Sequence, residues 1–175
     1  LPPGHPAIGA DTAKPGALPP GHPTTGATQP GAPGAIAGKP LHFVPSKSWV
    51  VKPPASQMRK AQYTLLGTGA TGEAELVVFH FPGMGGSADD NIKRWHAQFK
   101  TEAGGPPPST KTKTINGLKV TTTRISGTYA KPRDPTGMGG PTDDVAKYAL
   151  WGAIAETPAG PWFFKAIGPF DTLAA

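Results

Sequence analysis

The sequence predicts a chain of two parts, an extended Pro/Gly-rich arm over residues 1–45 and a single α+β domain over residues 46–175. The arm is predicted from its composition, because eleven prolines and eight glycines precede residue 46 and large apolar side chains are rare there. The domain is predicted because β-branched and aromatic runs, separated by turn signals, begin near Lys47. One further segment has helical periodicity, so a domain dominated by strands with a minority of helix is expected.

Composition excludes several classes of function. The formal net charge is +6 with only 16% charged residues, far from the dense basic stripe that phosphate binding needs, so no nucleic-acid partner is expected. The absence of cysteine removes disulfides, thiol catalysis and thiolate metal sites. No apolar run reaches eighteen residues, so no transmembrane segment is predicted. The first residue is leucine, which fits either an exported, extracytoplasmic protein after removal of its signal or part of a longer chain.

The arm contains one repeated motif. LPPGHPAIGA at Leu1 to Ala10 returns as LPPGHPTTGA at Leu18 to Ala27, identical at eight positions with an offset of seventeen. Proline fixes the backbone near polyproline geometry and glycine interrupts any stiff rod, so the arm is expected to be semi-extended. At about 3.1 Å per residue it could reach on the order of 100 Å, far enough to touch a neighbouring molecule.

The repeated motif has the chemistry of a docking peptide. Its leucine can fill an apolar pocket, its Pro-Pro pair presets the backbone, and its histidine can hydrogen-bond. Two copies on one tether raise apparent affinity through multivalency. Low-complexity drift in a passive spacer is the alternative, and both interpretations stay open. The predicted partner-docking residues are Leu1, Pro2, Pro3, His5, Leu18, Pro19, Pro20 and His22.

Other chemistry in the arm is less specific. His5 and His22 are seventeen residues apart without a nearby carboxylate or thiolate pair, so they do not resemble a closed metal site, and no metal or cofactor is predicted. Three threonines lie near prolines and are candidates for O-glycans in an exported protein: Thr24, Thr25 and Thr28.

Three strands are predicted at the start of the domain. They are Trp49 to Val51, Met58 to Leu66 and Ala74 to Phe81, and the second ends at the turn signal Gly67-Thr68-Gly69. The third strand is apolar at successive positions, which favours an interior strand covered on both faces.

A helix is predicted next, with Ser87 as its N-cap and Lys100 near its end. The acids Asp89 and Asp90 suit the positive end of the helix dipole. Ile92, Trp95, His96 and Phe99 share one face at helical spacing, and His96 is expected to be a hydrogen-bonded histidine at the border of the core. The preceding Pro82 to Gly86 lacks P-loop spacing, so a turn is expected. Trp95, Trp151 and Trp162 are likewise interpreted as core or border aromatics.

Two hairpins are predicted in the second half of the domain. Thr110 to Ile115 and Leu118 to Tyr129 flank Asn116-Gly117, which favours a type I′ turn. A glycine-rich loop is then expected over Lys131 to Asp144, with Asp143 and Asp144 solvated within it. The second hairpin is expected to join Tyr148 to Glu156 and Trp162 to Ile167 through Thr157 to Gly160. Gly168-Pro169 is expected to open a C-terminal helix that is truncated at Ala175.

The domain resembles a family of uncharacterised exported bacterial proteins of planctomycete type. The resemblance covers about Trp49 to Ala175 and depends chiefly on RWxxQF at Arg94 to Phe99 and GPWFFKxxGP at Gly160 to Pro169. It also draws on MRKAQYTL, AELVVFHFPGMGGSADDNIK, INGLKVT and YALWGAIAETPA. It implies a Mog1/PsbP-like α/β/α sandwich, a mainly antiparallel sheet with helices packed on it. Members continue into a full C-terminal helix, and this chain also lacks the cysteine that a lipoprotein would carry.

No catalytic constellation is visible, and the resemblance supplies no enzymatic residues. The sequence therefore predicts a non-enzymatic extracytoplasmic structural or accessory subunit whose arm docks on neighbouring subunits, as in a homo-oligomer, filament, surface assembly or larger complex. One alternative is a periplasmic small-ligand-binding module with a passive tether. Another is a PsbP-like accessory subunit of a membrane electron-transfer complex, an analogy of fold alone.

Overall fold

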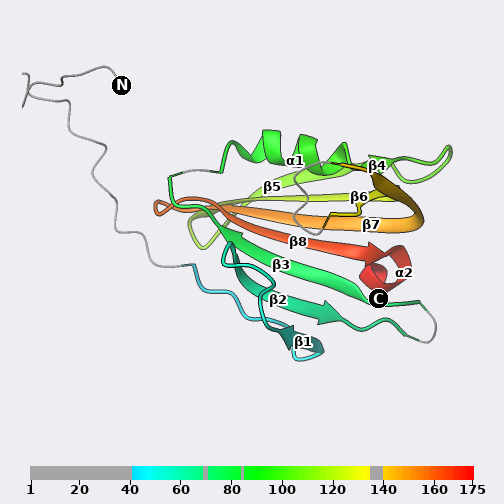
Figure 1. Ribbon diagram of the computed structural model, residues 1–175. Coiled ribbons are helices and arrows are strands. Elements are labelled where there is room, and N and C mark those ends of the chain that lie inside the picture. Colours follow the sequence, from blue (N-terminus) through cyan, green and yellow to red (C-terminus); the bar gives the residue numbers. More distant parts are fainter. Residues whose placement is uncertain (1–40, 69–70, 84, 135–139) are drawn as a thin grey trace, which may run out of the picture. The chain divides into compact units, whose positions relative to one another are not determined.

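A computed structural model describes residues 41–68, 71–83, 85–134 and 140–175. These residues form one eight-stranded sheet and two helices, with α1 running along one side of the sheet (Figure 1). Every strand pair is antiparallel. The α+β class and the mainly antiparallel sheet are confirmed.

The strands follow an order that interleaves early and late parts of the chain. The path is β1-β2-β3-β8-β7-β6-β4, and β5 pairs with β6 beside it. The strands are β1 Trp49–Lys52, β2 Arg59–Leu65, β3 Ala74–His80, β4 Phe99–Lys100, β5 Ser109–Ile115, β6 Leu118–Pro132, β7 Thr142–Glu156 and β8 Trp162–Pro169. The helices are α1 Ala88–His96 and α2 Phe170–Ala174.

β3 is an interior strand, as predicted, because it pairs with β2 on one side and β8 on the other. The adjacent residues Val77 and Val78 are both buried. Neighbouring side chains in a strand point to opposite faces, so both faces of the sheet are covered at this point.

The two faces of the sheet carry different clusters. On the face that we call the α1 face, Ile92 and Trp95 of α1 pack with Ile154 and Phe163. The opposite face, the α2 face, carries a cluster that includes Leu173 of α2. Phe43 belongs to that second cluster, and its ring meets Phe164 edge-on at 5.1 Å between centroids, although Phe43 lies within the predicted arm.

The Asn116-Gly117 hairpin is confirmed. β5 and β6 pair from Ile115 and Leu118 outward, with no residues between the strands other than this dipeptide. Asn116 has φ 49° and Gly117 has φ 82°, the two left-handed conformations that a type I′ turn requires. The turn is therefore determined locally by its two residues.

The predicted helix is too long at its C-terminus. α1 ends at His96, and Phe99 belongs to β4, where it pairs with Tyr129 of β6. The backbone N–H of Ala130 donates to the carbonyl of Gln98 at 2.8 Å, so sheet pairing takes over where helix was expected. Phe99 is still buried in one cluster with Trp95 nearby, which explains why its spacing resembled that of a helical face.

The predicted glycine-rich loop is also too long, because the strands run into it from both sides. Lys131 pairs with Asp143, and Pro132 pairs with Thr142. Arg133 reaches back across the strands to Asp143, with Nη2 to Oδ1 at 2.7 Å. Asp143 therefore lies in a strand and forms an ion pair with Arg133 at the exposed end of β6 and β7, where a residue of a solvated loop was expected.

The N-terminus of α1 tests whether the predicted N-cap residue stabilises the helix. Ser87 Oγ accepts from the backbone N–H of Asp90 at 3.1 Å, which confirms Ser87 as the N-cap. Replacing Ser87 with alanine is expected to lower the free energy of unfolding by about 1 kcal/mol, because one N–H of the first turn loses its acceptor. Denaturant unfolding measures this change. Ser109→Ala, on the exposed strand β5, is the matched control and is expected to change stability by less than about 0.5 kcal/mol.

Candidate functional site

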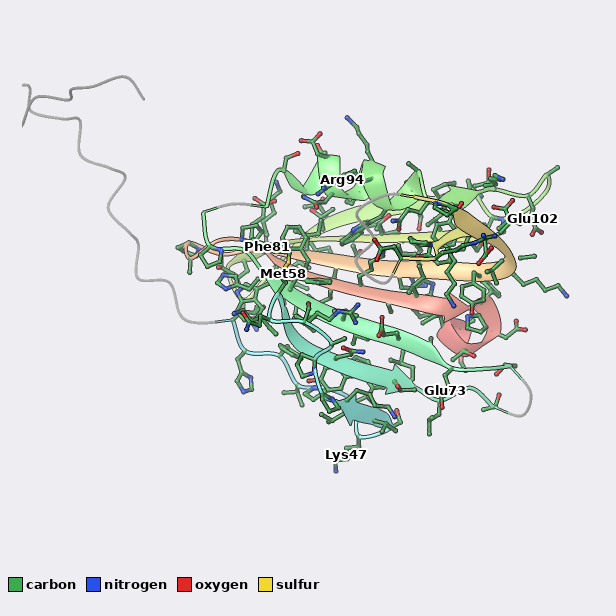
Figure 2. The ribbon with its side chains drawn as sticks, viewed as in Figure 1. Lys47, Met58, Glu73, Phe81, Arg94 and Glu102 are labelled. Carbon is green, nitrogen blue, oxygen red and sulfur yellow. The ribbon has the colours of Figure 1, made fainter. Side chains whose placement is uncertain are left out.

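The α1 face contains a cleft of about 470 Å³, which we call the Lys165 cleft. Its volume falls in the range of small-molecule sites. β2, β3, β6, β7 and β8 all contribute to it, and Glu73 lies where the chain enters β3 (Figure 2). The charged residues that line it are Arg59, Glu73, Glu75, Lys131, Asp134 and Lys165.

A glycine lies opposite Lys165 on the neighbouring strand. Gly152 of β7 is the register partner of Lys165 on β8, so no side chain stands beside the lysine there. The ring of Trp95 fills that space, since a Cβ on Gly152 would lie 2.8 Å from Trp95 Cε3. Trp95 is the penultimate residue of α1, and Gln98, three residues later, accepts from Lys165 Nζ. Gly152 therefore leaves room for Trp95, which lies three residues before Gln98.

Lys165 is a desolvated cation on the face of a sheet. Its side chain is half-buried, and Nζ donates to Gln98 Oε1 at 2.8 Å. Burial lowers the pKa of Lys165 to about 8, and the charge of Glu75 opposes part of that shift. Lys165 forms no ion pair within 4.0 Å with any residue that the structure describes. The ammonium group therefore has a neutral partner and a distant counter-charge.

Glu75 is held away from Lys165 by other donors. Arg59 Nη1 lies 3.1 Å from Glu75 Oε1, and Gln62 Nε2 donates to the same oxygen at 2.6 Å. Glu75 and Lys165 are diagonal neighbours on β3 and β8, because Glu75 pairs with Ile167 and Val77 pairs with Lys165. The Glu75 carboxylate is hydrogen-bonded to Arg59 and Gln62, and it acts on the pKa of Lys165 only through its charge.

Aromatic side chains form another part of the lining. Phe79, Tyr129 and Tyr148 all line the cleft, and the rings of Tyr129 and Tyr148 stack with 6.0 Å between centroids. Burial raises the pKa of Tyr129, with a smaller contribution from Glu75, so its hydroxyl stays protonated through neutral pH. The cleft combines a half-buried cation, a phenolic proton donor and aromatic ring surface.

The sequence-predicted docking residues, Leu1 to Pro3, His5, Leu18 to Pro20 and His22, lie outside the described residues. The same holds for the threonines proposed to carry sugar.

Residues of the domain that were assigned ordinary structural roles fulfil them. His96 Nε2 lies 2.7 Å from Thr123 Oγ1, which confirms a hydrogen-bonded border histidine, and burial lowers its pKa. Trp162 stacks on His80 at 4.3 Å. Arg124 lies over Trp151 at 4.2 Å, a cation–π contact.

Sequence reasoning missed Lys165 and Glu75. Both sit inside strands that were recognised, and a signal was present in the alternation of side chains. Phe163 and Ile167 flank Lys165 at two-residue spacing, and all three share one face of β8. A charged residue at an inward position between apolar neighbours marks a desolvated group, and this pattern could have identified the lysine.

Comparison with known proteins gives no family assignment: no protein-family model matches the sequence, and no curated protein matches it. Within the described ranges, no three His, Asp or Glu side chains are grouped so that they could hold a metal ion. Neither helix in the described part of the chain is long and apolar enough to cross a membrane.

Proposed function

We propose that this chain is a non-enzymatic binding module, outside the cytoplasm, whose Lys165 cleft holds a small organic anion with an aromatic or apolar body. The observation that carries the proposal is the environment of Lys165, a desolvated ammonium whose close hydrogen-bond partner is a neutral amide. A bound carboxylate would supply the counter-ion at short range. Charge-assisted hydrogen bonds of this kind are about twice as strong as neutral ones.

The wall of the cleft favours an aromatic body on that anion. The cleft is lined by three aromatic rings as well as by charged side chains. The rings are those of Phe79, Tyr129 and Tyr148. These rings are the apolar part of a lining that also carries six charged side chains. Mandelate, an aromatic hydroxy acid, is therefore a suitable probe.

Titration with mandelate tests this proposal. Binding is followed by NMR chemical shifts of the residues that line the cleft. Lys165→Met is expected to weaken binding at least about tenfold, because the counter-charge is lost. Lys113→Met, at an exposed lysine of β5, is the matched control and is expected to change affinity less than about twofold. Equal affinity in the two variants would overturn the proposal.

The pH dependence of mandelate binding has a defined sign. An anion prefers the protonated form of Lys165, so affinity is expected to be constant below the pKa of the free lysine, about 8, and to fall as pH rises through it. The titratable or charged groups that share the cleft with it are Arg59, Glu73, Glu75, Tyr129, Lys131, Asp134 and Tyr148. Arginine at position 165 stays charged throughout, so Lys165→Arg is expected to remove the fall between pH 8 and 10.

A second candidate function rests on the duplicated LPPGHP motif. In this proposal the chain is a structural or accessory subunit, and the arm docks on neighbouring subunits of a homo-oligomer, filament or larger complex. Accessory attachment to a membrane electron-transfer complex is a variant of it. Deleting residues 1–39 and measuring assembly by sedimentation tests the idea, and unchanged assembly would contradict it.

We also propose that the domain is a Mog1/PsbP-like sandwich. The antiparallel sheet supports this, together with the contacts of Trp95 in α1 on one face and Leu173 in α2 on the other. An experimental structure superposed on members of that fold tests the assignment, and a different strand order would overturn it.

A further inference from the structure

We infer that Lys165 binds α-oxo acids covalently, through a reversible imine between its Nζ and the ligand's carbonyl carbon. This inference deepens the proposed binding function and rests on it. It specifies the ligand class as a carboxylate with an adjacent aldehyde or ketone, and it adds bond formation to ion pairing.

The placement of Lys165 supports attack on a bound carbonyl. Lys165 lines a cleft of about 470 Å³, so a small ligand can reach it, and Gln98 lines the same cleft. Gln98 Oε1 accepts one N–H of the lysine at 2.8 Å and thereby fixes the direction of the amine. A lysine in such a partly desolvated site is the usual form of a Schiff-base nucleophile.

The other groups of the cleft suit the remaining atoms of an α-oxo acid. Lys131 lines the same cleft and can hold the ligand's carboxylate once Lys165 is neutral. Tyr129 keeps its proton at neutral pH and can donate it to the carbonyl oxygen. Phe79 and Tyr148 give an apolar surface for the rest of the ligand.

The reaction balances without an oxidant or reductant. Lys165 first loses one proton to water, and the nitrogen lone pair forms a bond to the carbonyl carbon. The π electrons of the C=O bond move to oxygen, which takes a proton from Tyr129 or water. The carbinolamine nitrogen then passes its second proton to that oxygen through water, the C–O bond breaks to release water, and the nitrogen lone pair forms the C=N bond. The resulting iminium gives its last proton back to the Tyr129 phenolate or hydroxide, which leaves the neutral imine. One amine and one oxo acid give one imine and one water, and hydrolysis reverses every step.

Availability of the neutral amine makes this reaction selective. With a pKa of about 8, about one tenth of Lys165 is neutral at pH 7. An ordinary lysine, with a pKa of about 10.4, is neutral there in less than about one molecule in a thousand. Even after allowance for the lower basicity of Lys165, we expect at least about tenfold preferential reaction at this residue.

Phenylglyoxylate is the probe, because it differs from mandelate only in having a ketone where mandelate has a hydroxyl. The full chain is incubated with phenylglyoxylate and cyanoborohydride at pH 7, which reduces any imine to a stable amine, and peptide mass spectrometry locates the adduct. Glyoxylate, with an aldehyde, is a second probe of the same class. The expected result is an adduct on Lys165 at least about tenfold more abundant than on exposed Lys113.

Lys165→Arg separates covalent from ionic binding. Arginine keeps the positive charge, so mandelate is expected to bind within about fivefold of the original affinity, whereas the adduct at position 165 disappears. Mandelate binding that depends on Lys165, with no preferential adduct from either oxo acid, would overturn the imine and leave the proposed function standing. If the original chain gives a selective adduct at Lys165 but does not bind mandelate, the anion-binding proposal is overturned and the reactive lysine is supported. Absence of both would overturn both.

Discussion

Replacing Lys165 with methionine is expected to raise the free energy of unfolding at pH 7 by about 2–3 kcal/mol. The lysine is charged at this pH in the folded and unfolded chains, and burial makes its charged form costly only when folded. Each pKa unit corresponds to about 1.4 kcal/mol, so the fall from 10.5 to about 8 corresponds to about 3–4 kcal/mol. Loss of the hydrogen bond to Gln98 offsets about 1 kcal/mol of that gain. Methionine keeps a similar length without a charge.

The pH dependence of this difference has a definite direction. Because the folded pKa lies below the unfolded one, the unfolded chain binds more protons between about pH 8 and 10.5. The contribution of Lys165 to stability therefore rises with pH across this window, and the advantage of the methionine variant shrinks. Urea unfolding of both proteins at several pH values measures the effect.

Lys113→Met is the control for this experiment, since Lys113 lies on the exposed strand β5. Its effect on stability is expected to stay within about 0.5 kcal/mol and to show little pH dependence over the same window. A Lys165→Met variant that is less stable than the original chain at pH 7 would contradict the account. A stabilising loss of a buried charge is characteristic of residues kept for function.

Gly152→Val is expected to destabilise the fold by about 3 kcal/mol. The new side chain would occupy the space of the Trp95 ring, and a Cβ alone would lie 3.2 Å from Thr123 Cγ2. Overpacking of this kind typically costs about 1–3 kcal/mol, and displacement of Trp95 also separates it from Ile154 and Phe163. Gln98 would move with the end of α1, so the pKa of Lys165 is expected to change as well.

A double-mutant cycle isolates the contact between Gly152 and Trp95. Gly152→Ala and Trp95→Leu are measured alone and together by denaturant unfolding. Leucine leaves room for the added methyl group. The double variant is therefore expected to lose less stability than the two single variants together, by at least about 1 kcal/mol. Strict additivity would show that Trp95 does not fill the space over Gly152.

The sequence allowed correct prediction where a few adjacent residues determine the structure. Asn116-Gly117 determines its turn through two left-handed conformations, and Ser87 determines the start of α1 through its own hydroxyl. The interior position of β3 followed from apolar residues on both pleat faces. These features require no knowledge of distant segments.

Prediction was wrong where partners far along the chain decide the structure. Phe99 leaves the helix because Tyr129 offers a strand to pair with, thirty positions later. β7 extends back to Thr142 because Pro132 continues the ladder. The Lys165 cleft was missed for the same reason, since Gln98, Glu75 and Lys165 come together only through the strand order. Alternation within β8 would have marked the lysine, but its partners could not have been inferred.

The most direct test of the central claim is an NMR titration of the Lys165 side chain, assigned by comparison with Lys165→Met. The account predicts that the Cε resonance of the free protein titrates with a midpoint near 8. Saturating mandelate is expected to raise this midpoint, because a bound anion favours the ammonium form. A midpoint near that of an ordinary lysine, unchanged by mandelate, would contradict the claim that this cleft holds a desolvated lysine ready for an anionic ligand.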